Sequence, residues 1–434
     1  MKKTVICILS AALCFGGVAG GHCRPEARSF AEFIKENPLR AAGTHHVYEP
    51  MDTSVTKAPC GYKPVYISHI GRHGSRYQTG PSSFRAVAQL ERFDSLGLLT
   101  EDGKHLLAIV SAVRDVTVGH YGELTELGGL EHRQIAGRMA RHYPEVFTNP
   151  QKTKIITHST ASGRVMKSRE NFLSVISQYY PQINYESYCL EPDEWTRPEV
   201  AGRSFTKEER ESLGSTGATA YTDSLFRVAD MSKFIAKTFV DGCFPDSTTS
   251  AGRFAINIYR TVGIRQCLDE EDLEFIESYY DEDEFRVIQE IENIYFFNYL
   301  CITEENRGLK AHVYGGPILE CMIADADSAL VAEDIAATLR FSHDTYLQPL
   351  LSIIGGTGND FQGTFRDANT HWFCGESVCM ATNVQMIFFR NRRGKVLVKI
   401  LHNDREISIP ALKARRRVFY DWDELKAYFA ERLK

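Results

Sequence analysis

An arginine-rich turn at residues 72–76 carries the residue types with the clearest chemistry in this chain. The run Arg72-His73-Gly74-Ser75-Arg76 places one imidazole between two guanidinium groups. Each guanidinium can hydrogen-bond two oxygens at once, so the pair suits a dianion such as phosphate. A histidine held between them would face the phosphorus atom rather than its oxygens. An exposed basic turn is the alternative interpretation, and this motif alone does not exclude it.

Similar polar residues follow two other predicted strands. The three strands are expected at residues 64–70, 154–157 and 338–342. Arg72 and His73 follow the first strand, Arg164 follows the second, and His343 and Asp344 follow the third. Helical patterns separate the strands, which predicts an α/β protein with a mostly parallel sheet. Ligands of such sheets bind beyond the carboxyl ends of the strands, so we expect these polar residues to meet at one edge.

Four motifs occur in a fixed order along the chain. They are Arg72-His73-Gly74-Ser75-Arg76, Leu124-Thr125-Glu126-Leu127-Gly128, Ser159 to Arg164, and His343-Asp344-Thr345. As a set they resemble the histidine acid phosphatases, the acid-phosphatase and phytase branch of the histidine phosphatase superfamily. The resemblance implies a phosphoglycerate-mutase-like fold with helices on both faces of the sheet and an inserted α-helical domain.

The first motif looks most like that of the multiple inositol-polyphosphate phosphatases, which favour an aromatic residue such as Tyr77 there. Two features depart from that group. Gln78 stands where proline is usual, and His343-Asp344 is the form of typical acid phosphatases and phytases rather than the His-Ala-Glu of many inositol-polyphosphate phosphatases. These departures concern the choice of substrate more than the catalytic core.

The residue types and the resemblance together predict a two-step phosphatase mechanism. A neutral His73 would attack phosphorus and form a phosphohistidine, which replaces one hard hydrolysis by two easier steps. Asp344 would protonate the leaving alcohol and then activate water. Four donors would hold the phosphate oxygens: Arg72, Arg76, Arg164 and His343. Each has a structural alternative: Arg164 as a surface residue, His343 as a core histidine, and Asp344 as a helix cap. His69 and His158 match no catalytic position and are expected to be structural.

The chain is expected to consist of three parts. Two lysines and a short apolar run within residues 1–20 are typical of a signal peptide, which predicts an exported, periplasmic or secreted protein. Residues 185–315 are helix-like and rich in aromatic residues, and we interpret them as the α-helical insertion. Residues 21–184 and 316–434 would then form the catalytic core.

Composition bounds the partners of the protein. The formal net charge of 434 residues is −6, which argues against a nucleic-acid or polybasic membrane surface. No later segment resembles a transmembrane span, and no cofactor is expected. No His/Asp/Glu cluster with metal-ligand spacing occurs, so the chemistry is expected to be metal-independent.

Cys374 and Cys379 share a short glycine-containing loop and are the best candidates for a local disulfide. The ten acidic residues of 269–284 favour a solvated helix face.

These observations predict an exported phosphomonoesterase that acts on a small phosphorylated substrate, phytate or another inositol polyphosphate. The alternatives are a broad-specificity acid phosphatase, a phosphoglycerate-mutase-like phosphotransferase, and a non-catalytic phosphate-binding protein on the same fold. A polyanionic substrate needs cations beyond those that grip the reacting phosphate. Lys63, Arg85 and Lys167 lie near the motifs in sequence and are candidates for this role.

Overall fold

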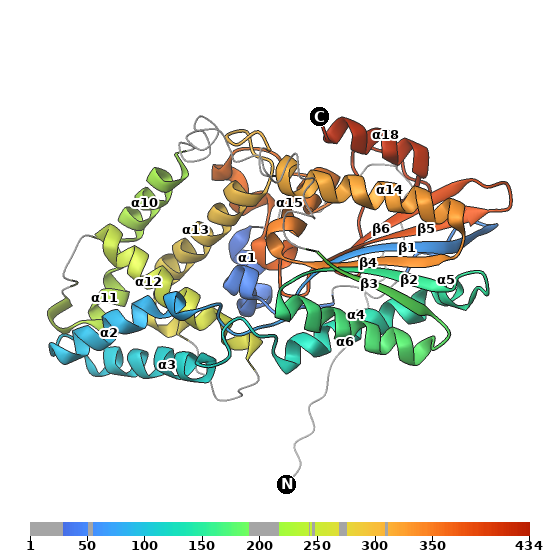
Figure 1. Cartoon of the computed structure of the whole chain (residues 1–434). Coiled ribbons are helices and arrows are strands. Elements are labelled where there is room, and N and C mark those ends of the chain that lie inside the picture. Colours follow the sequence, from blue (N-terminus) through green and yellow to red (C-terminus); the bar gives the residue numbers. More distant parts are fainter. Residues whose placement is uncertain are drawn as a thin grey trace, which may run out of the picture.

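The protein combines a sheet with helices on both faces and a helical part beside it (Figure 1). The structure is a computed structural model, and it describes residues 29–50, 55–190, 217–242, 244, 248–268, 276–308 and 311–434. The expected signal peptide, residues 1–20, lies outside the described residues, as do residues 269–275 of the acidic run.

The central sheet has eight strands in the order β3-β2-β4-β1-β5-β6-β7, with β8 paired to β6. Their bounds are β1 Tyr62–Arg72, β2 Lys154–Thr160, β3 Asn184–Leu190, β4 Ile335–Ser342, β5 Asn383–Asn391, β6 Val396–His402, β7 Arg405–Glu406 and β8 Phe419–Asp421. The four strands β3, β2, β4 and β1 run parallel, and β5 to β8 continue the sheet as antiparallel neighbours. The α/β class expected from the sequence is confirmed.

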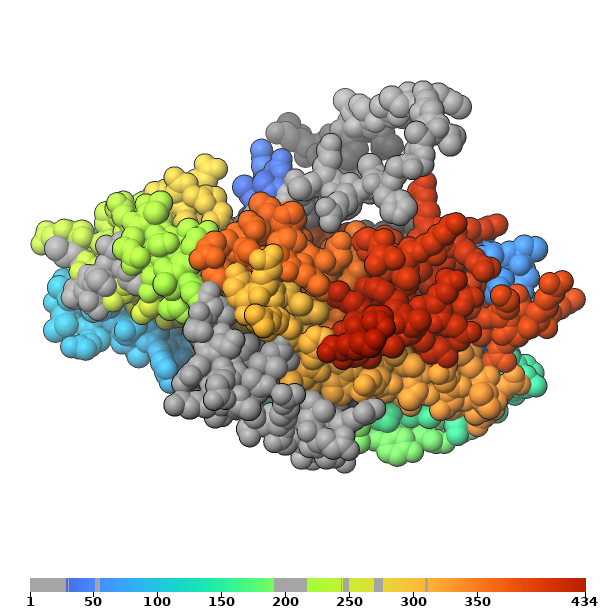
Figure 2. All heavy atoms as spheres, turned by 90° about the horizontal axis from the view of Figure 1, so that it is seen from above, coloured from blue at the N-terminus to red at the C-terminus, as the bar shows by residue number. Residues whose placement is uncertain are grey.

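Helices cover both faces of this sheet (Figure 1). One face carries α4 Glu126–His142, α5 Pro144–Thr148 and α6 Gly163–Tyr179, and the other carries α14 Gly316–Ala332, α15 Asp344–Ile354 and α18 Trp422–Arg432. Buried side chains such as Phe172 and Phe341 fill the first interface, and Leu350 and Phe388 fill the second. Figure 2 shows the C-terminal residues and those of α14 spread side by side over the second face.

The helical part has a core of its own. Its main elements are α2 Arg85–Ser95, α3 Glu101–Thr117, α10 Ala218–Ala229, α11 Ser232–Thr238, α12 Thr248–Gly263 and α13 Glu282–Leu300. Phe234, Phe239 and Phe254 are buried at its centre. Helices α2 and α3 precede the expected insertion in the sequence, yet they pack against α11 and α12. No helix in the described ranges is both long and apolar enough to cross a membrane.

Short elements join the two parts. Helix α1 Phe30–Glu36 and the 3₁₀ helix η1 Pro38–His45 lie at the junction, where η1 contacts α12, α13 and α17. The remaining elements are η2 Pro81–Phe84, η3 Val240–Gly242, η4 Ile264–Cys267, η5 Glu277–Tyr279, the π-helical turn η6 Ala311–Gly315, η7 Phe365–Asp367, α16 Ala368–His371 and α17 Cys374–Ser377. The chain therefore folds its N-terminal segment into the junction rather than around the outer surface.

All three predicted strands are longer in the structure than expected, and a further strand, β3, joins them. Residues 185–190 were assigned to the helical insertion, but they belong to β3, which extends the sheet in parallel beside β2. The third predicted strand begins at Ile335 rather than at residue 338, because α14 already ends at Ala332. Glu333 adopts a left-handed conformation with φ of 60°, which terminates the helix.

Two side-chain expectations are also wrong. Cys374 and Cys379 are both buried and both free, and the Cys379 sulfur lies 3.2 Å from the Thr382 hydroxyl. In the acidic run, Glu284 is buried rather than solvated, because its carboxylate accepts a hydrogen bond from the backbone amide of Lys233 at 2.7 Å. This carboxylate joins α13 to the start of α11.

Candidate active site

The carboxyl ends of three parallel strands coincide at one edge of the sheet. Strand β4 lies between β1 and β2, with Arg72 opposite Ser342 and Ser159 opposite Phe341. The backbone amide of His73 donates to the Ser342 carbonyl at 3.0 Å, which continues the pairing by one residue. The residues that follow these strands therefore meet, as the sequence predicts.

Two glycines allow the catalytic turn to contact the start of α4. A Cβ atom on Gly74 would lie 2.3 Å from the Gly128 carbonyl oxygen, and one on Gly128 would lie 2.2 Å from the Ser75 carbonyl oxygen. Thr125 caps α4 through its side chain, and its backbone amide donates to the Ser75 carbonyl at 3.0 Å. The first two sequence motifs thus form one packed unit. Gly74 is required by this backbone contact as well as by the turn.

A buried carboxylate, Glu131 of α4, fixes the same turn. It accepts hydrogen bonds from the Ser75 amide at 2.7 Å and the Ser75 hydroxyl at 2.8 Å. A third hydrogen bond comes from the Tyr48 amide at 2.9 Å. Burial raises the pKa of Glu131, although these hydrogen bonds oppose the effect. The sequence analysis missed Glu131, whose only signal is its place one helical turn after Gly128.

Arg72 is fully buried and held on three sides. Its Nη1 donates to the Thr44 carbonyl at 2.6 Å and to the Val378 carbonyl at 2.7 Å. Its Nη2 lies 3.0 Å from Oδ2 of Asp344. The guanidinium is therefore fixed in position before any ligand binds.

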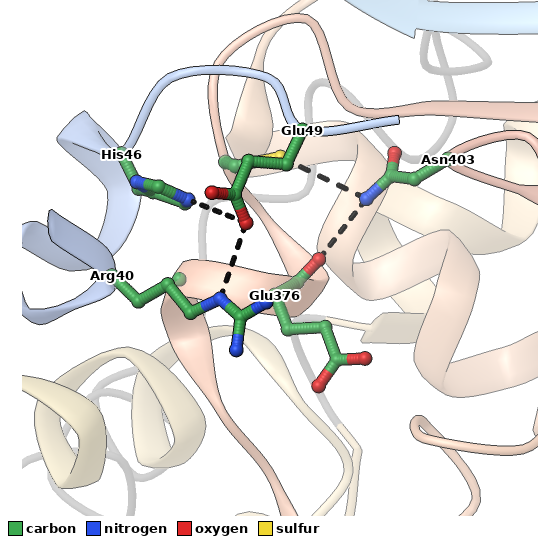
Figure 3. Close-up of a pocket in the computed structure, with 7 residues that line it drawn as sticks. Arg40, His46, Glu49, Glu376 and Asn403 are labelled. Carbon is green, nitrogen blue, oxygen red and sulfur yellow. Dashed lines mark hydrogen bonds and ion pairs between the residues drawn. The ribbon is translucent and has the colours of Figure 1, made fainter. Parts of the chain in front are cut away.

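A small pocket is lined by residues that are close in sequence to Thr44 and Val378 (Figure 3). Arg40 Nε and His46 Nε2 both lie close to Oε2 of Glu49, at 3.2 and 3.4 Å, and Asn403 donates to the Glu376 carbonyl at 3.0 Å. The hydrogen bond from His46 and the charge of Arg40 lower the pKa of Glu49 to about 2, although burial opposes them. The pocket measures about 10 Å³, which is no more than one water molecule needs. Its lining residues therefore serve as a structural contact between η1 and α17 and not as a binding site.

One ring nitrogen of His73 makes no hydrogen bond to the part of the chain that the structure describes. Its Nδ1 lies 2.9 Å from the Gly74 carbonyl oxygen. Burial, together with the charges of Arg72 and Arg76, holds the pKa of His73 well below its usual range. A neutral imidazole can bond to a carbonyl only as a donor, so Nδ1 carries the proton and Nε2 keeps its lone pair. The lone pair of Nε2 is therefore available to an electrophile.

Two more guanidiniums lie close to His73, and their charges also lower its pKa. Arg76 is buried, and burial with the charges of Arg72 and Arg164 lowers its own pKa to about 10. Arg164 is the second residue of α6, at the helix end where the dipole favours anions. The Nε atoms of all three arginines are buried and have no hydrogen-bond partner among the described residues. The site offers donors that an oxyanion would satisfy.

His343 stands edge-on to His73, with the ring centroids 5.5 Å apart. Its Nε2 lies 3.2 Å from the Thr160 hydroxyl at the end of β2. Burial and the charge of Arg164 lower the pKa of His343 to about 4. It is a half-buried residue facing the cations and not a core histidine.

Asp344 lies in the first turn of α15 and also beside Arg72. Its Oδ1 accepts a hydrogen bond from the Thr345 amide at 2.9 Å in the first turn of α15, and its Oδ2 faces Arg72. Burial alone would raise the pKa of Asp344, but the charges of Arg72 and Arg76 outweigh it and lower the pKa. The carboxylate therefore faces Arg72 from the first turn of α15, and the alternative of a helix cap is wrong, because the N-cap residue is His343.

One further titratable residue belongs to the site, and sequence reasoning missed it. His45 ends η1, and burial with the charges of Arg76 and Arg72 holds its pKa well below the usual range. The chain reaches this place only because η1 folds into the junction, and no motif around His45 signals that path. His69, in contrast, is packed between Phe172 and Phe341 and is structural, as expected.

The three candidate peripheral cations are all exposed. Lys63 is near the start of β1, nine positions before Arg72, which in an extended strand is on the order of 30 Å. Its assignment to the substrate pocket is therefore wrong. Arg85 begins α2, and Lys167 lies one turn after Arg164 on α6.

Comparison with known proteins gives strong likeness in fold at low sequence identity. No protein-family profile matches the sequence. The multiple inositol polyphosphate phosphatase of Bifidobacterium longum in complex with inositol hexasulfate is 18% identical with a TM-score of 0.73, and the match covers 91% of this chain and 98% of that one. The same protein in complex with phosphate gives 17% and a TM-score of 0.75, with the same coverage. The phytase from D. castellii is 13% identical with a TM-score of 0.67, covering 91% of this chain and 84% of its own.

The chain has the fold of these phosphatases. The resemblance that the four motifs predict is thereby confirmed at the level of fold. The inositol-polyphosphate-phosphatase and phytase neighbours match over nearly their whole length, so the helical part is included in the likeness.

Proposed function

We propose that this chain is a phosphomonoesterase that removes phosphates from inositol polyphosphates through a phosphohistidine at His73. One observation carries the proposal: a neutral imidazole lies among three guanidiniums whose Nε atoms are buried and have no hydrogen-bond partner among the described residues. A non-catalytic phosphate-binding protein would need the cations alone. The unprotonated nucleophile and the carboxylate of Asp344 favour an enzyme.

Binding comes first in the proposed mechanism. Arg72, Arg76 and Arg164 take the phosphate oxygens, with His343 as a further donor. Their charges match the charge of the transferring group, and Arg72 is already fixed by Thr44 and Val378. Donors that need no rearrangement at the moment of reaction give the largest catalytic contribution.

Chemistry follows in two steps. His73 Nε2 attacks phosphorus while the leaving oxygen takes a proton from Asp344, which releases the alcohol and leaves a phosphohistidine. Asp344 then removes a proton from water, which attacks the phosphoenzyme and regenerates His73. The arginine charges lower the pKa of Asp344, and a bound phosphate offsets those charges. Substrate binding therefore favours the protonated carboxyl that the first step needs.

The substrate class rests on two supports. The Arg72-to-Tyr77 motif has the form of the inositol-polyphosphate phosphatases, and a structural neighbour binds inositol hexasulfate. A broad-specificity acid phosphatase remains the second candidate, because the His343-Asp344 form is shared with that group. The two candidates differ in how much a distant phosphate contributes to binding.

We expect phytate to be hydrolysed at least as efficiently as glucose phosphate at low ionic strength. The preference should shrink as salt rises, because attraction between peripheral phosphates and exposed cations is screened within about 8–10 Å at physiological salt. The measurement is kcat/KM for both substrates at low and high salt. A tenfold preference for glucose phosphate at low salt would assign the protein to the broad acid phosphatases.

Activity is expected to survive exhaustive treatment with a chelator. The three arginines supply the positive charge that a metal ion would bring, and His73 needs no metal to become unprotonated. Within the described ranges, His, Cys, Asp and Glu side chains form no group of three that could hold a metal ion. Phosphate release is measured before and after chelation. Loss of activity that zinc or magnesium restores contradicts this mechanism.

The proposal also covers how the chain divides into domains and that the protein is exported. Residues 21–184 and 316–434 would form the phosphatase core together with β3, and the rest of residues 185–315 would form the helical insertion. Residues 1–20 would be removed on export. Amino-terminal sequencing of the protein recovered from cells should show a start close to residue 21, and an intact Met1 would contradict export by a cleaved signal.

A further inference from the structure

A groove with three arginines runs between α4 and α6, away from the catalytic turn. It measures about 260 Å³ and is lined by Arg133, Gln134, Gly137, Arg138, Arg141, Val175 and Tyr179. The catalytic turn contacts α4 at Gly128. Thirteen residues of helix separate Gly128 from Arg141, which is about 20 Å. The groove is therefore a separate feature from the phosphate site.

Gly137 makes room for one of these arginines. A Cβ atom at this position would lie 3.1 Å from Nη1 of Arg141, which is closer than side chains normally approach. Nη1 of Arg141 also lies 3.4 Å from the Tyr179 hydroxyl on α6. The Arg141 guanidinium is thus folded back over Gly137 along the groove, although the residue is exposed.

The charges lining the groove are only partly balanced. Arg133 pairs with Glu126, and Arg138 pairs with Asp404 at 2.7 Å. Arg141 makes no ion pair with any described residue. Arg138 is only 8% exposed, and its Nη2 is buried without a hydrogen-bond partner in the described part of the chain. Arg141 is therefore the lining arginine whose charge no described carboxylate neutralises.

We propose that this groove is a second anion site, which binds a small oxyanion through Arg141 with the Tyr179 hydroxyl as a further donor. Guanidinium groups match the geometry of phosphate, sulfate and carboxylate oxygens. The volume of the groove exceeds that of a free phosphate ion, so the oxyanion can be part of a larger small molecule. The site is independent of the proposed catalytic function.

Calorimetric titration of the whole protein tests this site with two probes, inorganic phosphate and inositol hexasulfate. Wild type should bind two equivalents of at least one probe. Arg141→Gln should weaken one of the two events at least tenfold and leave kcat unchanged. Gly137→Ala should weaken the same event, because the added methyl group displaces the Arg141 guanidinium. Arg92→Gln, which changes an exposed arginine on α2, is the matched control and should bind as wild type does.

The two probes separate the sources of the oxyanion. Binding of inorganic phosphate identifies a site for the free ion, and binding of inositol hexasulfate alone identifies a site for an organic polyanion. A single equivalent of both probes in wild type would overturn the proposal. So would two equivalents that Arg141→Gln and Gly137→Ala leave unchanged, because the second event would then lie elsewhere. Arg164→Gln, in the catalytic site, should weaken only the other event.

Discussion

Replacing His73 with alanine should reduce kcat for phosphomonoesters by on the order of 10⁴- to 10⁶-fold, as removal of a catalytic nucleophile does in other enzymes. The expectation follows from the free Nε2 and from the low pKa that burial and the neighbouring arginines impose on His73. No other described side chain in the site combines these features with a position between Arg72 and Arg76. Steady-state kinetics with phytate and with an aryl phosphate measure the loss.

The control for this variant is His158→Asn. His158 lies on β2 close to the same edge, but its ring stacks on Tyr188 of the edge strand β3 at 5.4 Å. Its replacement should leave kcat within a few-fold of wild type. The sequence leaves an exposed turn as an alternative, but His73 is buried in the structure. Its replacement can therefore disturb the packing, and circular dichroism checks that the variant is folded. A folded His73→Ala protein with more than 1% of wild-type activity would exclude His73 as the nucleophile.

Asp344→Asn should separate substrates by their leaving groups. Hydrolysis of alkyl phosphates such as phytate should fall by roughly 10²- to 10⁴-fold, the usual contribution of a positioned general acid. An activated aryl phosphate should lose far less, because its leaving group departs without a proton. Equal losses on both substrates would exclude Asp344 as the general acid.

The same variant should change the pH profile. In wild type, His73 stays unprotonated in acid because its pKa is held far below 6.5, whereas Asp344 must be protonated to act as the acid. Activity on alkyl phosphates should therefore be greatest in acid and fall as the pH rises and Asp344 loses its proton. In Asp344→Asn this dependence should disappear, since no proton is left to titrate at that position.

The sequence predicts the catalytic edge well because its signals are local. A short apolar run ends in Arg72, another leads to Arg164, and a third ends next to His343. A parallel α/β arrangement brings such strand ends together without further information. The helix caps at Thr125 and Asp421 are local signals of the same kind, and both occur in the structure.

The sequence fails where a contact depends on distant segments. Nothing near Glu131 indicates that it holds Ser75, and nothing near His45 indicates that η1 reaches Arg72. Lys63 is close to the first motif in sequence but lies toward the other end of an eleven-residue strand. The Gly74–Gly128 contact joins residues 54 positions apart. From the sequence, each glycine can be explained by its own turn or helix, although the close contact between the two backbones is what requires both.

The central claim is that phosphate is transferred to His73, and trapping the phosphoenzyme tests it most directly. Wild-type protein is mixed with substrate labelled in its phosphate and is quenched within the first turnover. Peptide mapping should then place an acid-labile, base-stable label on the peptide that contains His73, and His73→Ala should show no label. Label on a serine, on an aspartate or on a different histidine would contradict the account.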